Sequence, residues 1–216
     1  MKAGGIAIAG LLFVTGLAAC KRQDPPERAE TAQRAKRIQP AAGGPPAGGR
    51  VFLNGAQLEQ ALASKTLDRP VKSLLAVDGP LHFGNYRWND QAVPDGPLWI
   101  RVDLGAQIIS VFRAGHEIGT AVIVYGGDNK RTPGGRLQIL ARDKDHRSSI
   151  YDADMPYTLQ LTHDGVAIHG SDVRRGRATH GCVGVPLEFA RRLFDAAKVG
   201  DEVVIIPVSA KEAVTT

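Results

Sequence analysis

Apolar and polar residues alternate along several short stretches in the second half of the chain. Between 98 and 104, Ile100, Val102 and Leu104 alternate with Arg101 and Asp103. Alternation of this kind predicts a strand with one buried face. Two more apolar stretches, 107–113 and 117–125, follow at short spacing, and the second comes after a turn signal at 113–116. The pattern therefore predicts three consecutive strands.

Further strands follow toward the C-terminus. We expect one at 136–142 with Leu137, Ile139 and Ala141 facing inward, and a last one at 202–208. Stretches 157–162 and 166–170 flank His163-Asp164-Gly165, where Asp-Gly is typical of a hairpin turn. Many short strands joined by tight turns predict a mainly β fold with antiparallel pairing.

Two stretches have helical periodicity instead. Residues 187–200 place a set of apolar residues on one helical face, with Pro186 as the first helical residue and Gly200 near the end. That set is Leu187, Ala190, Leu193, Phe194 and Ala197. A shorter helix is expected within 54–65, capped by Asn54. Turn signals and short apolar runs fill the rest of 51–94, which we interpret as an N-terminal extension packed on the main domain.

The first nineteen residues have the layout of a secretory signal. Lys2 gives a basic start, an apolar run extends from 6 to 17, and small residues precede Cys20. Residues 17–20, Leu-Ala-Ala-Cys, resemble the bacterial lipobox, which implies cleavage after residue 19 and lipidation of Cys20. Lys21 then implies sorting to the outer membrane. The alternatives are an ordinary buried helix cysteine and an uncleaved membrane anchor. The prediction is a periplasm-facing lipoprotein of a Gram-negative cell envelope.

Residues 20–50 predict a disordered tether. They are rich in Pro, Gly and charge and nearly free of aliphatic side chains, so they cannot bury enough surface to order themselves. The net charge of +5 lies before Val51, with Lys2 contributing one charge and this segment the rest, because basic and acidic residues are equal in number from Val51 onward. A basic pI would otherwise suggest nucleic acid. The sequence contains no nucleic-acid-binding module, and we expect no nucleic-acid partner.

Cys182 is the candidate for chemistry. Cys20 and Cys182 are the chain's two cysteines, and if Cys20 carries lipid, Cys182 has no disulfide partner in an oxidising compartment. Cys182 is then either buried and inert or reactive. A reactive thiol needs a base, which His169 can supply, and backbone N–H groups for an oxyanion, which Gly181 and Cys182 can supply. A low-pKa thiol is the expected mark of an enzyme.

The segments "VAIHGS" and "ATHGCVGVP" resemble the L,D-transpeptidase catalytic domain, the YkuD-type family, whose signature is His-Gly-Ser/Thr followed by Ser/Thr-His-Gly-Cys. "PLWIRVDLGAQIISVFRAG", "VYGGDNKRTPGG" and "MPYTLQL" are also similar to the family's surrounding segments. The resemblance implies an L,D-transpeptidase-type β-sandwich with one or two short helices at 95–208, followed by a tail at 209–216.

Carried over from the family, Cys182 is the nucleophile and His169 activates it. The resemblance also implies that a backbone carbonyl, that of Gly170, orients His169. An oxyanion and active-site loop is expected from His180, Gly181, Gly170, Ser171 and Thr179. Gly184 departs from the family, which usually has Arg or Asn at that position, and the loop between His169 and Cys182 is short.

Substrate contacts are expected from basic and aromatic residues, namely Arg174, Arg175, Arg177, Tyr125 and Tyr157. For the arginines a solvated basic loop is the alternative, and for the tyrosines ordinary packing. The resemblance implies no cofactor and no metal. The rival zinc site would use His169, His180, Cys182 and Asp172, but His-x-Cys lacks the usual zinc-ligand spacing.

The implied activity is acyl transfer on peptidoglycan stem peptides. Cys182 would attack the third stem residue, meso-diaminopimelate, expel the terminal D-alanine, and pass the acyl group to the amine of a neighbouring stem, which cross-links the wall. Carbapenems would acylate Cys182. One alternative is a carboxypeptidase or a hydrolase of wall-attached protein that uses the same Cys and His. A second is a non-catalytic lipoprotein that binds peptidoglycan.

Overall fold

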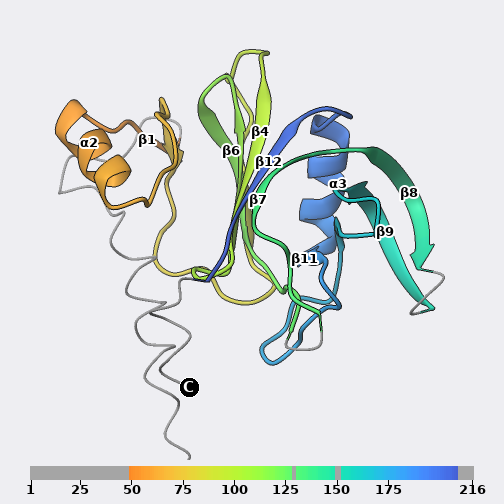
Figure 1. The fold of residues 1–216 in the computed structure, drawn as a ribbon. Helices are drawn as coiled ribbons and strands as arrows, with labels where there is room; N and C mark the ends of the chain where they lie inside the picture. The colour runs from red at the N-terminus through yellow and green to blue at the C-terminus, as the bar shows by residue number, and fades with distance from the viewer. Residues whose placement is uncertain (1–48, 128–129, 149–151, 209–216) are drawn as a thin grey trace, which may run out of the picture.

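The computed structural model describes residues 49–127, 130–148 and 152–208. The predicted signal peptide, Cys20, the tether up to residue 48 and the tail from 209 lie outside the described residues. Two β-sheets form the main domain, and a smaller unit with one helix and a two-stranded sheet precedes them in the chain (Figure 1).

The larger sheet has six strands in the order β3-β6-β5-β4-β12-β7. Their bounds are β3 Tyr86–Trp88, β4 Leu98–Asp103, β5 Ile108–Arg113, β6 His116–Val122, β7 Gly135–Gln138 and β12 Glu202–Ile206. Neighbours pair antiparallel except β4 and β12, which run parallel. Ala114 and Gly115 both have positive φ, 51° and 86°, as a tight type I′ hairpin turn between β5 and β6 requires. The three predicted strands and this turn are confirmed.

The smaller sheet has four strands in the order β11-β10-β9-β8. Their bounds are β8 Ala141–Ser148, β9 Ala153–Gln160, β10 Ala167–Gly170 and β11 Val183–Val185. β8 and β9 form a long curved hairpin that leads away from the core (Figure 1). β9 and β10 pair antiparallel through the predicted Asp-Gly turn, whereas β10 and β11 run parallel.

The segment at 136–142 was predicted as one strand, and this prediction is wrong. The chain leaves the six-stranded sheet after Gln138 and enters the four-stranded sheet at Ala141. Ile139 is buried at the crossing, but Ala141 is exposed rather than inward. The alternation of a single strand is lost because the backbone passes from one sheet to the other between Gln138 and Ala141.

Helix α3, Leu187–Ala196, packs against β9, β10 and β6. Apolar residues of both sheets and of this helix form one core, as a β-sandwich requires. Phe189 is fully buried and meets Tyr86 and Trp88 edge-on. The predicted helical face was partly wrong, because Leu187 is 52% exposed. Pro186 is the N-cap rather than the first helical residue, so Leu187 starts the helix outside the core.

The N-terminal extension contains β1 Arg50–Val51, helix α2 Gly55–Ala63 and β2 Leu74–Leu75. Asn54 caps α2 in a capping box with Gln57, so the predicted cap is confirmed. Leu58, Ala61 and Leu62 pack toward a cluster that includes Trp99 and Phe112 of the main sheet. The extension is therefore packed on the main domain.

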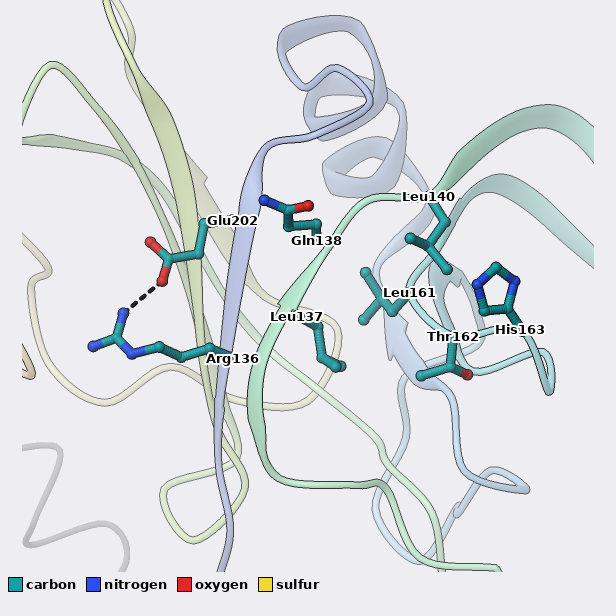
Figure 2. Close-up of a pocket in the computed structure, with 8 residues that line it drawn as sticks. All are labelled: Arg136, Leu137, Gln138, Leu140, Leu161, Thr162, His163 and Glu202. Atoms are coloured by element: carbon teal, nitrogen blue, oxygen red, sulfur yellow. Dashed lines mark hydrogen bonds and ion pairs between the residues drawn. The ribbon is translucent and has the colours of Figure 1, made fainter.

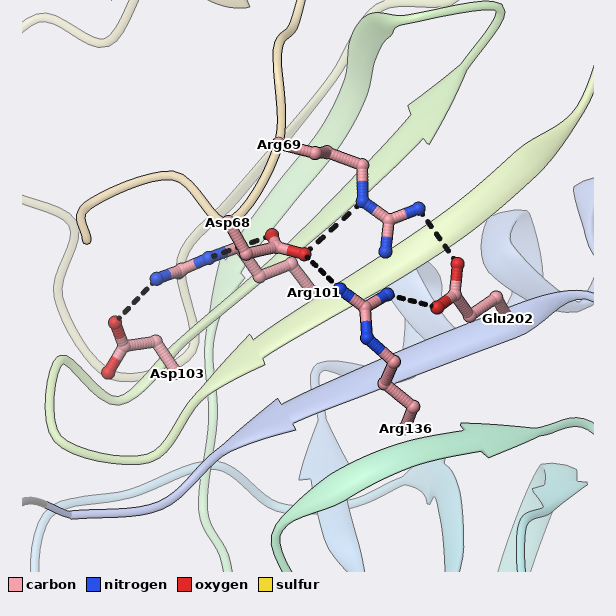
Figure 3. A network of polar contacts seen from close by, with 6 residues as sticks. All are labelled: Asp68, Arg69, Arg101, Asp103, Arg136 and Glu202. Carbon is pink, nitrogen blue, oxygen red and sulfur yellow. Dashed lines mark hydrogen bonds and ion pairs between the residues drawn. The ribbon is translucent and has the colours of Figure 1, made fainter. Parts of the chain in front are cut away.

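An ion-pair network also joins the extension to the main sheet (Figure 3). Arg69 lies 2.8 Å from Glu202 on β12 and 3.2 Å from Asp68. Arg136 on β7 lies 2.5 Å from Glu202 and 3.6 Å from Asp68. Arg101 on β4 reaches Asp68 as well, at 3.8 Å. The Arg69 guanidinium also lies over the Trp99 ring, 4.2 Å from its centroid.

The N-terminal extension includes Arg50, one residue before the boundary that the sequence indicated. Arg50, assigned above to the tether, lies in β1 and is 8% exposed. Its guanidinium donates to the carbonyl oxygens of Glu117 and Asn89, which explains how a charged residue is held inside. Among the described residues, no helix is long and apolar enough to cross a membrane.

Candidate active site

The parallel pair of β10 and β11 brings the two candidate catalytic residues together. Ile168 pairs with Val183 and His169 with Gly184, and Cys182 immediately precedes β11. Asp-Gly at 164–165 turns the chain into β10, and Gly165, with φ at 92°, takes a conformation that favours glycine. Continued by one residue, this register places Cys182 opposite Ala167, two residues before His169, although Cys182 and His169 are thirteen positions apart in the sequence.

His169 is buried and oriented by the backbone. It is 8% exposed, and its Nδ1 atom lies 2.9 Å from the carbonyl oxygen of Gly170. A carbonyl oxygen can only accept, so Nδ1 carries the hydrogen and Nε2 is left as the basic nitrogen. Burial lowers the pKa of His169, and the charge of the nearby His146 lowers it further. The hydrogen bond with Gly170 raises the pKa in part. The imidazole is therefore neutral at pH 7 and able to accept a proton.

The Cys182 thiol is partly buried, and its Sγ atom donates to the carbonyl oxygen of Gly165 at 3.6 Å. Burial raises the pKa of this thiol, while the backbone N–H of Ala167 and the charge of Lys130 oppose the rise. The low-pKa thiol expected from the sequence is therefore contradicted for this state of the protein. A neutral thiol beside a neutral imidazole still allows general-base activation during attack.

The loop before the cysteine is fixed by its own backbone and by the 125–127 segment. Thr179 donates from Oγ1 to the carbonyl oxygen of Cys182 at 2.5 Å, and its N–H donates to the carbonyl oxygen of Tyr125 at 2.9 Å. Gly181 has φ at 101°, so the turn into Cys182 needs glycine. His180 is exposed on the same loop.

Gly184, the departure from the family pattern, has a steric reason. A Cβ atom on Gly184 would lie 2.7 Å from Cγ2 of Val124 and 2.8 Å from Cβ of Ser171. Gly184 also exchanges backbone hydrogen bonds with Val124 at 2.8 and 3.0 Å, which links the two sheets. Gly170, likewise buried, would place a Cβ 3.0 Å from Leu187. No side chain at 184 can reach a substrate here.

The predicted substrate-binding arginines are exposed and partly paired. Arg174 lies 2.6 Å and Arg177 3.9 Å from Asp172, so this carboxylate competes for both. Arg175 is exposed on the same loop. The structure therefore groups Arg174 and Arg177 around Asp172 on the loop that leads to the cysteine.

The two predicted tyrosines are partly buried against the main core. Tyr157 meets the Phe194 ring edge-on, with 5.8 Å between centroids, so packing accounts for part of its surface. Its φ of 57° marks an irregular point on β9, where a bulky residue rarely adopts this conformation. Tyr125 is held beside the cysteine loop through its carbonyl.

Two residues near the site were missed by the sequence analysis. Lys130 lies close enough to Cys182 for its charge to act on the thiol, and His146 of β8 lies close enough to His169 to affect its pKa. Lys130 lies in the family-like segment at 124–135 and His146 in no such segment, but neither belongs to the two catalytic motifs, so only their place in the fold reveals them. Within the described ranges, no cluster of three or more His, Cys, Asp or Glu residues is arranged to hold a metal ion.

A cavity of about 670 Å³ opens between β7 and the β9–β10 turn (Figure 2). Arg136, Gln138 and Glu202 give it one polar side, and Leu137, Leu140 and Leu161 an apolar one. Its lining does not include Cys182 or His169. Thr162 and His163, which also line it, belong to the turn that precedes Gly165, the thiol's acceptor. The cavity is thus lined in part by the same turn that supplies the thiol's acceptor.

The chain is similar in fold to known proteins. No curated protein sequence matches the chain. The fold is similar to the L,D-transpeptidase (Yku) of Stackebrandtia nassauensis, with a TM-score of 0.51, 19% identity, and coverage of 84% of this chain and 77% of that one. An L,D-transpeptidase from Mycobacterium smegmatis has a TM-score of 0.48 and 19% identity, with 51% of this chain and 58% of that chain covered. L,D-transpeptidase 3 from Mycobacterium tuberculosis, in complex with a faropenem-derived adduct, has a TM-score of 0.47 and 16% identity, with 51% of this chain and 60% of that chain covered.

The chain thus spans less than two thirds of the length of several L,D-transpeptidases that it resembles, and at these identities the likeness concerns the fold. Residues 97–205 match the model of the YkuD family, described as the L,D-transpeptidase catalytic domain. This range runs from β4 into β12 and includes both candidate catalytic residues. This chain belongs to the L,D-transpeptidase (YkuD) family.

Proposed function

We propose that this protein is a peptidoglycan L,D-transpeptidase in which Cys182 is the nucleophile and His169 the general base. The observation that carries the proposal is the parallel pairing of β10, which contains His169, with β11, which begins directly after Cys182, together with the contact of His169 Nδ1 with the Gly170 carbonyl. That hydrogen bond leaves Nε2 as the atom that takes a proton. The family match supports the reaction class.

The first half-reaction forms a thioester. His169 Nε2 accepts the thiol proton as Cys182 Sγ attacks the carbonyl carbon of the third stem residue. The tetrahedral oxyanion is stabilised by N–H groups of the loop at Gly181 and Cys182, beside His180. The intermediate collapses, the peptide bond breaks, and the imidazolium gives its proton to the amine of the departing D-alanine.

The second half-reaction uses the amine of a neighbouring stem as acceptor. His169 takes a proton from the attacking amine, a new amide forms, and the Cys182 sulfur leaves and recovers a proton. No external energy source is needed, because the thioester retains the energy of the broken peptide bond. If water attacks in place of the amine, the same residues perform the carboxypeptidase reaction.

The thiol in the free protein must be brought from Gly165 to His169 before attack. Its proton is directed at the Gly165 carbonyl, and burial keeps the thiol protonated. Catalytic hydrogen bonds are often long or misaligned without substrate, so we attribute the final alignment to the bound stem. For this reason a slowly alkylated thiol in the free protein would not argue for a non-catalytic binding protein.

The experiment is mass spectrometry of the full chain in detergent with purified disaccharide-tetrapeptide, compared with Cys182→Ala. We expect a cross-linked dimer that is lost in the variant. Tripeptide monomer without dimer would assign the carboxypeptidase activity instead. Unchanged tetrapeptide with both proteins would contradict an enzymatic role and favour the peptidoglycan-binding lipoprotein. A carbapenem incubated with the wild type should add its mass to the peptide that contains Cys182.

We also propose that residues 1–19 are a signal peptide, that Cys20 carries lipid, and that the domain faces the periplasm from the outer membrane. The supporting observation is the sequence pattern ending in Leu-Ala-Ala-Cys at residue 20. Cys20→Ser should move the protein from the membrane fraction to the soluble fraction without changing acylation of Cys182. Membrane retention of that variant would contradict lipid anchoring through Cys20.

A further inference from the structure

The side chain of Lys130 covers the turn that leads into Cys182. A Cβ atom placed on Gly181 would lie 3.3 to 3.5 Å from the Cγ, Cδ and Cε atoms of Lys130. The hydrocarbon stem therefore lies along the glycine backbone and fills the space that another residue's side chain would take. The stem comes from the segment that follows Gly127, so it crosses to the cysteine loop from outside the two sequence motifs.

The ammonium at the end of this stem has a weakly held partner. Lys130 Nζ lies 3.9 Å from Oδ2 of Asp164, and the two side chains are 37% and 71% exposed. An exposed pair at this distance contributes little to stability, between about 0 and 1 kcal/mol. An anion from a substrate can therefore replace the Asp164 carboxylate at small cost.

Both charges act on the nucleophile. Lys130 favours the charged form of Cys182, and Asp164 disfavours it. Asp164 precedes Gly165, whose carbonyl oxygen accepts from the thiol. The ammonium and the carboxylate thus come from two segments near the sulfur, one at Lys130, before β7, and one in the β9–β10 turn.

The other cations near the cysteine loop are less available. Arg174 is held by Asp172 at 2.6 Å, and Arg177 lies 3.9 Å from the same carboxylate. Position 184, two residues after the cysteine, has no side chain and no room for one. Lys130, in contrast to Arg174 and Arg177, lies against Gly181 with its charge acting on Cys182, so it is placed to meet a carboxylate beside the sulfur.

We propose that Lys130 is a specificity-determining residue that binds the C-terminal carboxylate of the donor stem, in exchange for Asp164. The inference rests on the proposed function and names the recognition element of its first half-reaction. In a stem cleaved before its last residue, the terminal carboxylate lies about one residue, roughly 3.8 Å, beyond the scissile carbonyl. A cation that acts on the sulfur and lies against Gly181, next to the cysteine, is at the right range for that carboxylate.

The first test needs no peptidoglycan. The full chain in detergent is alkylated with iodoacetate or iodoacetamide, and the modified peptide that contains Cys182 is quantified by mass spectrometry. The two reagents differ by one carboxylate, so the ratio of their rates reports a cation near the sulfur. We expect the iodoacetate/iodoacetamide ratio to fall about tenfold in Lys130→Met, to be kept in Lys130→Arg, and to rise in Asp164→Asn.

Lys198→Met is the matched control, because Lys198 also pairs with an aspartate, Asp201, but in the connection between α3 and β12. It should leave the ratio unchanged. Thermal unfolding of Lys130→Met should match the wild type, since the removed ammonium is exposed and weakly paired. An unchanged ratio in a folded Lys130→Met would overturn the inference.

The second test compares acylation by a tetrapeptide donor with acylation by its C-terminal carboxamide. We expect the wild type to prefer the acid about tenfold and Lys130→Met to treat both alike. If the variant kept the preference, Lys130 would not be the determinant, while the proposed function would stand. If neither donor acylated the wild type but the alkylation ratio still fell in Lys130→Met, the anion site would stand and the proposed function would fail.

Discussion

The Nδ1 atom of His169 lies 2.9 Å from the carbonyl oxygen of the next residue, Gly170. This contact fixes the tautomer, because a carbonyl cannot donate a hydrogen bond, and it leaves Nε2 as the basic nitrogen of the ring. Burial lowers the pKa of the ring more than the Gly170 hydrogen bond raises it. The consequence is an imidazole that stays neutral somewhat below its ordinary pKa of about 6.5.

The pH dependence of acylation follows from this direction. The rate should hold from pH 7.5 through 6.5 and fall only as the pH drops through the lowered pKa of His169, because the protonated ring cannot accept the thiol proton. His169→Gln should lose about 10²- to 10⁴-fold in acylation rate and lose this acid limb. The measurement is the rate of Cys182 acylation against pH by intact-mass spectrometry. An acid limb centred above pH 6.5 would contradict the assignment.

Thr179 provides a matched pair of variants. Its Oγ1 donates to the carbonyl oxygen of Cys182 at 2.5 Å and so fixes the peptide unit beside the nucleophile. Thr179→Val removes the hydroxyl but keeps the shape, and we expect acylation to fall about fivefold to tenfold, the equivalent of one hydrogen bond. Thr179→Ser keeps the hydroxyl and should stay close to the wild-type rate. Equal rates in the two variants would show that the contact does not position the loop.

Gly184 is predicted to tolerate no side chain. A Cβ atom there would approach Val124 and Ser171 to 2.7 and 2.8 Å, in a strand held on both sides. Gly184→Ala should lower the free energy of unfolding by about 1 to 3 kcal/mol in urea titrations. Gly55→Ala, at the start of α2 with no atom within 4 Å of the added methyl, is the control and should change it by less than about 1 kcal/mol. A neutral Gly184→Ala would contradict the steric explanation of this glycine.

The regular parts of the fold were predictable because they follow simple periods. The sequence of β4 alternates apolar and polar residues, although Arg101 and Asp103 are buried as well, and β5 and β6 are apolar runs. Helix α2 is marked by its capping residues Asn54 and Gln57. β8 was missed because its residues, such as Asp143 and Asp145, are charged and exposed, so no apolar period marks it. It is a strand only because β9 pairs with it along the hairpin.

The candidate site was predictable where a motif carries it and unpredictable where only packing does. His169, Gly170 and Cys182 lie in the two motifs, and the Gly170 contact was expected. The direction of the pKa shift of Cys182 was not expected, because it depends on burial, and burial is a property of the fold. Lys130 was missed for a similar reason: its stem reaches Gly181 across 51 residues of sequence, and no local pattern reports that approach.

The network around Glu202 predicts how the N-terminal extension responds to pH. Hydrogen bonds from Arg69, and then from Arg136, hold the pKa of Glu202 below its ordinary value. A carboxyl with a lowered pKa in the folded state stabilises the protein above its unfolded pKa, and this contribution is lost as the pH falls through the folded one. Glu202→Gln should therefore lower the free energy of unfolding by about 1 kcal/mol at pH 7, with the difference from the wild type disappearing as the pH falls through the lowered pKa of Glu202.

Because Arg69 belongs to the extension and Glu202 to β12, the same variant should also expose residues 50–75 to protease sooner than the wild type at pH 7. Glu188→Gln is the matched control, since Glu188 pairs with Arg191 on the exposed face of α3. It should change the free energy of unfolding by less than about 0.5 kcal/mol and leave the cleavage pattern unaltered. If Glu202→Gln and Glu188→Gln behaved alike in both measurements, the apolar contacts around Trp99, and not the ion pairs, would hold the extension in place.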